Sequence, residues 1–191
     1  MGTQLVTSRH PTRRILGIDP GLNTTGYGVI EVGHAGHQGG PVPLQGPIRL
    51  IEAGIVRSKA QGSIESRLNE IHTGVREVIE SHEPELMALE QLFSHYARPR
   101  TAILMGHARG VICLAAAQSN LKVVHFEPTR VKKVMTGNGR APKHQIQLAV
   151  KIQLDLPTIP EPADVADALA IALCGYHLGN ASSMSKLSKL S

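Results

Sequence analysis

The stretch Ile15-Leu16-Gly17-Ile18-Asp19-Pro20-Gly21 decides the expected fold, because it joins an apolar run directly to a turn. The apolar run is typical of a buried strand, and Pro-Gly is a strong turn signal. Asp19 therefore stands where the strand ends, at the margin of the core. A carboxylate in that position is costly to remove from water unless a cation meets it. Asp19 could also simply cap the turn, so its role depends on which other residues approach it.

The composition is that of one globular domain with a basic surface. The chain has 191 residues, of which 41% are apolar, and its net charge is +5 with a pI of about 9.5. This balance favours a polyanionic partner, most simply nucleic acid. The sequence has no apolar run near the roughly 18 residues that cross a bilayer, and no signal peptide is expected. Cys113 and Cys174 lie far apart in apolar stretches, which is typical of buried free thiols in a reducing cytoplasm rather than of a disulfide or a zinc site.

Periodicity and turn signals predict a mixed α/β domain. Strands are expected at 13–18, 26–32, 48–57, 86–90 and 121–126, the first three as an antiparallel meander. Helices are expected at 64–81, 101–118, 128–135, 143–154 and 162–178. Residues 1–12 and 179–191 are polar and are expected to be disordered arms, which leaves one domain at 13–178. This order of elements predicts a five-stranded mixed sheet flanked by helices.

Acidic residues fall where this fold brings separate elements together. Asp19 ends one strand and Glu90 ends a strand expected to be parallel to it, so both acids leave the same edge of the sheet. Asp164 and Asp167 share one face of the last helix, which can point at the other two acids. Glu90 could instead be a solvated strand end, and Asp164 is favoured by the helix dipole in any case. Asp167 lies among alanine and leucine, where an acid without a partner is harder to explain.

Four converging carboxylates need a counter-charge. Hard divalent cations such as Mg²⁺ or Mn²⁺ favour oxygen ligands. Two such ions about 4 Å apart can activate a water molecule and stabilise a leaving oxygen in phosphoryl transfer. The acidic residues therefore predict a two-ion site for phosphoryl chemistry.

Basic residues gather in the second half of the chain. The segment 122–143 contains six lysines and arginines against one acid, Glu127, and the polar loop expected at 91–100 adds two arginines beside Phe93. Basic side chains that neutralise phosphates supply most non-specific affinity for DNA. A solvated helix face is the simpler alternative. The candidates for contact with DNA are Phe93, Arg98, Arg100, Arg130, Lys132, Lys133, Arg140 and Lys143.

Several motifs together resemble the RuvC family of Holliday-junction resolvases, in the family's order and over about residues 14–178. They are Ile15 to Gly21, Thr25-Gly26-Tyr27-Gly28, Leu89-Glu90-Gln91-Leu92-Phe93, Ala108-Arg109-Gly110-Val111, Arg130 to Lys143, and Ala163-Asp164-Val165-Ala166-Asp167-Ala168-Leu169-Ala170.

The resemblance implies a ribonuclease-H-like fold that works as a homodimer. It implies that Asp19, Glu90, Asp164 and Asp167 are metal-binding catalytic acids, and that Lys132 and Lys143 support the active site or contact the DNA backbone there. It also implies that Phe93 stacks on a base at the junction centre, although Phe93 could instead anchor its loop. The partner implied by the resemblance is the RuvA–RuvB branch-migration complex.

The resulting hypothesis is a metal-dependent endonuclease that resolves four-way DNA junctions by two symmetric nicks during recombination and repair. The nearest alternative is a ribonuclease-H-like enzyme that processes RNA. A non-catalytic junction-binding module would not need all four acids. An actin-like or sugar-kinase-like ATPase needs a second nucleotide-binding domain, for which 191 residues leave no room.

Overall fold

A five-stranded mixed sheet forms the centre of the protein, as seen in a computed structural model that describes residues 12–33, 47–92 and 99–187. The order across the sheet is β3-β2-β1-β4-β5. β1 pairs antiparallel with β2 and β2 with β3, whereas β4 runs parallel to both β1 and β5. The bounds are β1 Thr12–Asp19, β2 Thr24–Gly33, β3 Ile48–Arg57, β4 Leu86–Glu90 and β5 Lys122–Phe126. The predicted mixed sheet is therefore confirmed.

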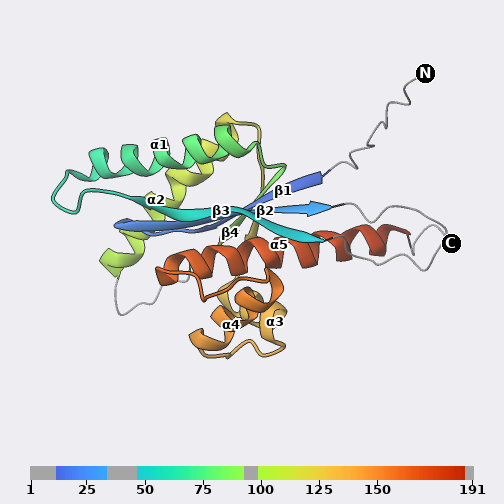
Figure 1. Cartoon of the computed structure of the whole chain (residues 1–191). Coiled ribbons are helices and arrows are strands. Elements are labelled where there is room, and N and C mark those ends of the chain that lie inside the picture. The colour runs from blue at the N-terminus through green and yellow to red at the C-terminus, as the bar shows by residue number, and fades with distance from the viewer. Residues whose placement is uncertain (1–11, 34–46, 93–98, 188–191) are drawn as a thin grey trace, which may run out of the picture.

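Helices cover both faces of this sheet (Figure 1). Helices α1 and α2 pack on one face, and α5 lies across the other, with α3 and α4 beyond it. Their bounds are α1 Ile64–His82, α2 Pro99–Gln118, α3 Pro128–Thr136, α4 Lys143–Gln153 and α5 Ala163–Leu187. The predicted amphipathic period of α1 is confirmed, because Ile71, Val75, Val78 and Ile79 are the residues that it buries.

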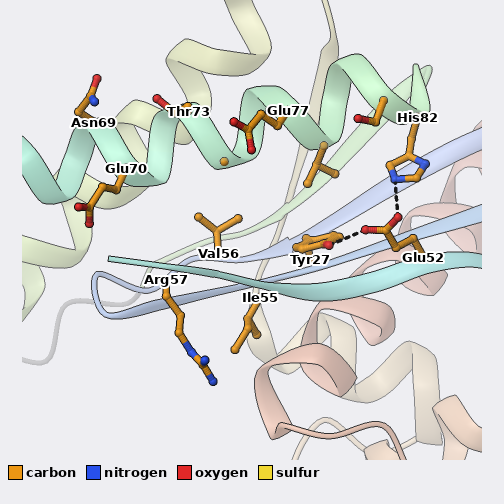
Figure 2. A pocket seen from close by; sticks show the side chains of 13 residues that line it. Tyr27, Glu52, Ile55, Val56, Arg57, Asn69, Glu70, Thr73, Glu77 and His82 are labelled. Atoms are coloured by element: carbon orange, nitrogen blue, oxygen red, sulfur yellow. Dashed lines mark hydrogen bonds and ion pairs between the residues drawn. The ribbon is translucent and has the colours of Figure 1, made fainter. Parts of the chain in front are cut away.

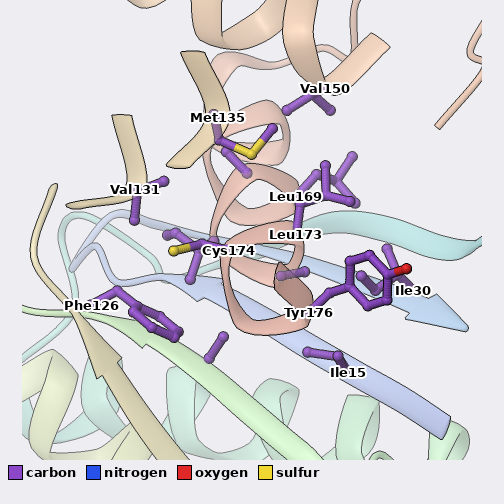
Figure 3. Packing of buried hydrophobic residues seen from close by; sticks show 14 of the residues in the cluster. Ile15, Ile30, Phe126, Val131, Met135, Val150, Leu169, Leu173, Cys174 and Tyr176 are labelled. Carbon is purple, nitrogen blue, oxygen red and sulfur yellow. The ribbon is translucent and has the colours of Figure 1, made fainter. Parts of the chain in front are cut away.

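Helix α5 is buried on several sides, because it lies between the sheet and the pair α3 and α4. Figure 3 shows Leu169 and Leu173 of α5 between the strands and the side chains of Met135 and Val150. Both leucines are completely buried. Such a helix is apolar nearly all round, so the two aspartates in its first turns stand out as polar residues with a specific surrounding.

Two glycines of the sheet allow α5 to approach very closely. A Cβ atom on Gly17 of β1 would lie 2.1 Å from the carbonyl oxygen of Ala168, and a Cβ atom on Gly26 of β2 would lie 2.1 Å from the carbonyl oxygen of Asp164. Neither contact is possible for a residue with a side chain. The backbone of α5 is therefore held directly against β1 and β2, at the height where β1 ends in Asp19.

The predicted boundaries are wrong at two helix ends. Helix α5 continues to Leu187, so residues 179–187, predicted to be a disordered tail, are helical. Serine lowers helix propensity only slightly, and no proline follows Pro162, so the long packed helix propagates into this stretch. Helix α2 begins at Pro99 rather than at 101, because proline suits the first position of a helix. Arg100 therefore lies in a helix and not in the predicted loop.

Some sequence predictions concern residues outside the described ranges. These are the polar arm up to residue 11, most of the connection at 33–47, and the loop residues Phe93 and Arg98. Within the described residues, both cysteines are free, Cys174 buried and Cys113 partly so. None of the described helices combines the length and apolar character needed to span a membrane.

Candidate active site

Asp19 and Glu90 stand side by side at one edge of the sheet. The last residue pair between the parallel strands β1 and β4 is Ile18 with Leu89. Each acid is the next residue after that pair, and each closes its strand. Adjacent parallel strands send equivalent positions in the same direction, so the two carboxylates share the carboxyl edge of the sheet, as predicted.

Helix α5 brings the other two predicted acids to the same edge. Asp164 lies in its first turn and Asp167 one turn further along. Because Gly26 has no side chain, this first turn lies directly against β2 at the Asp164 carbonyl oxygen. Gly26 is in turn the β2 partner of Asp19. Asp19, Gly26 and Asp164 therefore come together from three separate segments of the chain.

The acids influence one another's ionisation. Burial and, after it, the carboxylates of Glu90, Asp167 and Asp164 together raise the pKa of Asp19 to about 8. Burial and, after it, the carboxylate of Asp167 raise the pKa of Glu90 to about 7. Like charges disfavour the ionised form only over short distances. The structure thus brings all four predicted acids into one electrostatic cluster.

Two lysines supply positive charge to this cluster. The Lys143 ammonium group donates a hydrogen bond to Asp167 Oδ2 at 2.6 Å, and this contact raises the pKa of the lysine. Lys143 and Lys132 both oppose the rise in the pKa of Glu90. The two lysines, Glu90 and Asp167 line a hollow of about 270 Å³ between α5 and the pair α3 and α4, whose remaining lining is apolar. The structure therefore places both lysines beside Glu90 and Asp167.

The chemistry of the cluster suits a hard divalent cation, because its possible ligands are carboxylate oxygens. Within the described ranges, however, no three His, Cys, Asp or Glu side chains are arranged closely enough to hold one metal ion. Asp167 is turned to Lys143 instead. The donor set fits such an ion, and the acidic side chains would have to rotate toward one another to share it.

The other predicted basic residues within the described ranges are all exposed to solvent. Arg130 and Lys133 are exposed on α3, and Arg140 is exposed in the connection that leads to α4. In that connection Gly137 adopts a left-handed backbone that ends α3, and the Asn138 side chain accepts a hydrogen bond from the Arg140 main chain. Arg100 is exposed at the start of α2. These residues present positive charge to solvent without a carboxylate partner among the described residues.

A larger hollow lies elsewhere, between α1 and β3, and contains none of the four acids. It measures about 650 Å³. In it the Tyr27 hydroxyl donates a hydrogen bond to Glu52 at 2.6 Å, and His82 Nε2 lies 3.1 Å from the other Glu52 oxygen (Figure 2). The Tyr27 ring also covers Gly54, whose added Cβ atom would lie 2.8 Å from the hydroxyl oxygen. These contacts join β2, β3 and α1, and they explain the hollow as part of the fold.

Sequence reasoning missed one residue that contacts the site. Arg109 of α2 donates from Nε to the main-chain oxygen of Glu90 at 3.2 Å, and its Nη2 lies 2.7 Å from Nδ1 of His125. The motif Ala108-Arg109-Gly110-Val111 was recognised, but no role for its arginine follows from the local sequence. Its two partners are 19 and 16 residues away, so only the folded chain reveals them.

A mixed five-stranded sheet with acids from β1, β4 and a buried helix at one edge defines a ribonuclease-H-like nuclease. The family model for crossover junction endodeoxyribonuclease RuvC matches residues 15–175. The crossover junction endodeoxyribonuclease RuvC of Rhodopirellula baltica is 63% identical over 182 residues, which cover 94% of this chain and 96% of that protein. The chain belongs to the RuvC family.

Solved structures agree with this assignment. The structure of Thermus thermophilus RuvC in complex with a Holliday junction substrate matches with a TM-score of 0.75 at 32% identity, covering 87% of this chain and 94% of that one. A yeast mitochondrial Holliday junction resolvase matches with a TM-score of 0.60 at 9% identity, covering 97% of this chain and 89% of that one. The second match concerns the fold alone.

Proposed function

We propose that this protein is a metal-dependent endonuclease that resolves four-way DNA junctions by paired symmetric nicks during recombination and repair. The observation that carries the proposal is the convergence of Asp19, Glu90, Asp164 and Asp167 at one sheet edge in a member of the RuvC family. Relatives that match over nearly the whole chain are crossover junction endodeoxyribonucleases. The solved Thermus thermophilus relative is bound to a Holliday junction substrate.

The four acids are proposed to hold Mg²⁺ or Mn²⁺, two ions per active site. When bound, such ions stabilise the charge that develops as water attacks a phosphodiester in line with the leaving oxygen. The raised pKa values of Asp19 and Glu90 support this role, because both carboxyl groups ionise readily only when positive charge is brought to them. The acids thus form a site that becomes fully charged as cations bind.

Lys143 and Lys132 are proposed to serve the phosphate. Lys143 pairs with Asp167 in the structure. If Asp167 turns toward a cation, the ammonium group of Lys143 is released at the edge of the hollow. A scissile phosphate there would meet positive charge from both lysines. The hollow also has an apolar wall formed by Val131, Ile146 and Ile171.

The DNA backbone is proposed to cross the basic surface around this hollow. Arg130 and Lys133 are exposed on α3, Arg140 in the connection to α4, and Arg100 at the start of α2. Phe93 and Arg98 belong to this proposal through the family resemblance alone, because they lie outside the described residues. Contacts of this kind give affinity that weakens as salt is added.

A homodimer is proposed, because two related nicks need two active sites with two-fold symmetry. Helix α2 offers a surface for it. Ile103 and Leu114 are 61% and 49% exposed, and eleven residues apart they lie on nearly the same side of the helix. Gly106 and Gly110 lie between them, and a Cβ atom on either would meet nothing within 4 Å in the described protomer. A second helix could approach this strip closely.

Two further elements of the proposal follow from the family. The RuvA–RuvB branch-migration complex is the proposed partner, which brings the nuclease to junctions. The proposed location is the cytoplasm, where a bacterial cell holds its DNA. An RNA-processing ribonuclease-H-like function remains the alternative, and the curated relatives do not favour it.

The deciding experiment presents the purified protein with matched substrates in Mg²⁺ or Mn²⁺. These are a synthetic four-way DNA junction, a DNA duplex, and an RNA–DNA duplex of the same sequence. We expect two nicks at symmetric positions in strands of like polarity on the junction, and intact linear duplexes. Preferred cleavage of the RNA strand would contradict the proposed function and support the alternative.

A further inference from the structure

Arg109 lies on α2 and contacts the main chain of Glu90 on β4 and the side chain of His125 on β5. It lies on α2 between residues that face the core, with Ala108 and Ile112 completely buried. Its guanidinium donates to the Glu90 main-chain oxygen at 3.2 Å and reaches His125 Nδ1 on β5 at 2.7 Å. The ladder between β1 and β4 stops at Ile18 and Leu89, so Glu90 lies beyond the last pair with β1. Arg109 thus contacts the strand end where β1 no longer pairs with it.

The Glu90 carboxylate needs such support. It lines the same hollow as the carboxylate of Asp167, so two negative charges face each other there. An acid that is repelled by its neighbours moves away from them unless its backbone is fixed. On the β5 side, the strand end is held by the hydrogen bond from Gln91 N–H to the Phe126 carbonyl at 2.8 Å. The charge-assisted hydrogen bond from Arg109 holds the adjacent carbonyl of the same strand end.

We propose that Arg109 is a positioning residue, which fixes the main chain of Glu90 for catalysis and ties the active site to helix α2. This inference rests on the proposed nuclease function. The same helix carries the exposed strip with Ile103 and Leu114. A change in the position of α2 therefore reaches Glu90 through one guanidinium group. The alternative is that Arg109 only stabilises the fold. The two roles predict different cleavage rates for the folded Arg109 variants.

The test compares Arg109→Ala, Arg109→Lys and the control Arg76→Ala in the full-length protein. Arg76 is a half-exposed arginine of α1 that pairs with Glu80 and contacts none of the four acids. Single-turnover cleavage of a synthetic junction, junction affinity without divalent ions and thermal melting are measured for each. Partners that orient metal ligands typically contribute 10- to 100-fold in activity.

For Arg109→Ala we expect cleavage about 10- to 100-fold slower, with junction affinity within about threefold of the parent. Methylguanidinium added at millimolar concentration should restore part of the Arg109→Ala rate, because it replaces the missing donor, and should leave Arg76→Ala unchanged. Arg109→Lys should cut at an intermediate rate, since lysine keeps the charge but loses the planar pair of donors. Because lysine preserves most of the packing, this variant keeps the test valid should Arg109→Ala fold poorly.

Parent-like cleavage by Arg109→Ala would overturn the inference. So would a loss of cleavage that is matched by an equal loss of junction affinity or of folded protein in both variants, without recovery by methylguanidinium. A parent protein that leaves the junction intact would overturn the proposed function together with this inference. If the parent cleaves the junction and Arg109→Ala cleaves it at the same rate, the inference is overturned and the proposed function stands.

Discussion

At the scale of single residues, Asp19 is the acid on which the others act most strongly. After burial, which has the largest effect, Glu90, Asp167 and Asp164 all raise its pKa, and only Lys143 lowers it. Bringing these carboxylates together lowers the stability of the protein when no ligand is bound. Sites that bind a ligand or catalyse a reaction commonly carry such a cost in stability. Two predictions at this scale separate the catalytic role of Asp19 from its effect on stability.

Asp19→Asn should nearly abolish junction cleavage and leave junction binding within about threefold. The substitution removes a charged ligand from the proposed ion site, and the stabilisation supplied by such ions is worth several kcal/mol, or about a thousandfold in rate. The basic surface that holds the DNA is untouched. Gel-shift and cleavage assays on one preparation measure both quantities. Substantial residual cleavage would exclude Asp19 as an essential ligand.

The stability difference between Asp19→Asn and the parent should depend on pH. The pKa of Asp19 is about 8 in the folded protein and about 3.8 when unperturbed. Between these values the folded state holds a proton that the unfolded chain releases, so rising pH lowers the free energy of unfolding. Asparagine removes this penalty. Without divalent ions, Asp19→Asn should gain about 3–4 kcal/mol over the parent at pH 8 relative to pH 5, because each pH unit in this window contributes about 1.4 kcal/mol for one proton.

Urea unfolding of both proteins at the two pH values, with a chelator present, measures this effect. The raised pKa of Glu90 and the depressed pKa values of His125 and His177 are present in both proteins, so the difference between them reports Asp19 together with its coupling to Glu90. An advantage of the variant that is the same at pH 5 and pH 8 would show that Asp19 ionises normally in the fold.

At the scale of elements, the close packing of α5 against β1 and β2 decides where Asp164 and Asp167 lie. This packing depends on backbone-to-backbone contact at Gly17 and Gly26, because a larger residue at either position would keep the helix further from the sheet. Helix α5 is also packed under α3 and α4, so it has little freedom to move without disturbing the core. The positions of two catalytic candidates thus depend on residues that carry no side chain.

Gly26→Ala should impair cleavage much more than DNA binding. Its Cβ atom would lie 2.1 Å from the Asp164 carbonyl oxygen, so the first turn of α5 must move by about 1 Å or more. A misplacement of this size can cost about 100-fold in rate, and overpacking typically costs about 1–3 kcal/mol in stability.

Gly62→Ala is the matched control, in the loop before α1, where the nearest atom to an added Cβ is 3.1 Å away. Single-turnover rates and urea midpoints of both variants test the prediction. Normal cleavage by Gly26→Ala would mean that the site tolerates movement of α5.

At the scale of the whole molecule, the proposed paired nicks require two copies of the chain. The exposed strip of α2 is the surface proposed to join them. Leu114 is 49% exposed there, and Leu148 on α4 is a leucine of similar exposure, 41%, elsewhere on the protein. The pair allows a matched test of whether α2 forms the contact.

Leu114→Glu should convert a dimer into a monomer, whereas Leu148→Glu should leave the dimer intact. A charge buried in an interface is costly unless it is paired, and neither side chain is part of the core. Sedimentation at micromolar concentration measures the oligomeric state, and circular dichroism checks that both variants fold. A parent that sediments as a clean monomer, or a dimeric Leu114→Glu, would count against this interface.

The sequence by itself determined the elements and the two strand-end acids. Runs of apolar residues, helical periodicity, and proline and glycine at turns are local signals, so they predicted the five strands and the core of each helix. Because Asp19 and Glu90 each follow such a run directly, their shared edge followed once the two strands were read as parallel. The motifs also identified the family, since they depend on residue order rather than on geometry.

Only the tertiary structure decided how close the separate segments come. The pairing of Lys143 with Asp167 and the contacts of Arg109 join residues 16 to 24 positions apart. The continuation of α5 to Leu187 also escaped prediction, because a weak local preference for helix is extended by a long packed neighbour. Distances across a core depend on the packing of many side chains at once. A local pattern therefore shows which residues can meet, and the packed fold decides which of them do.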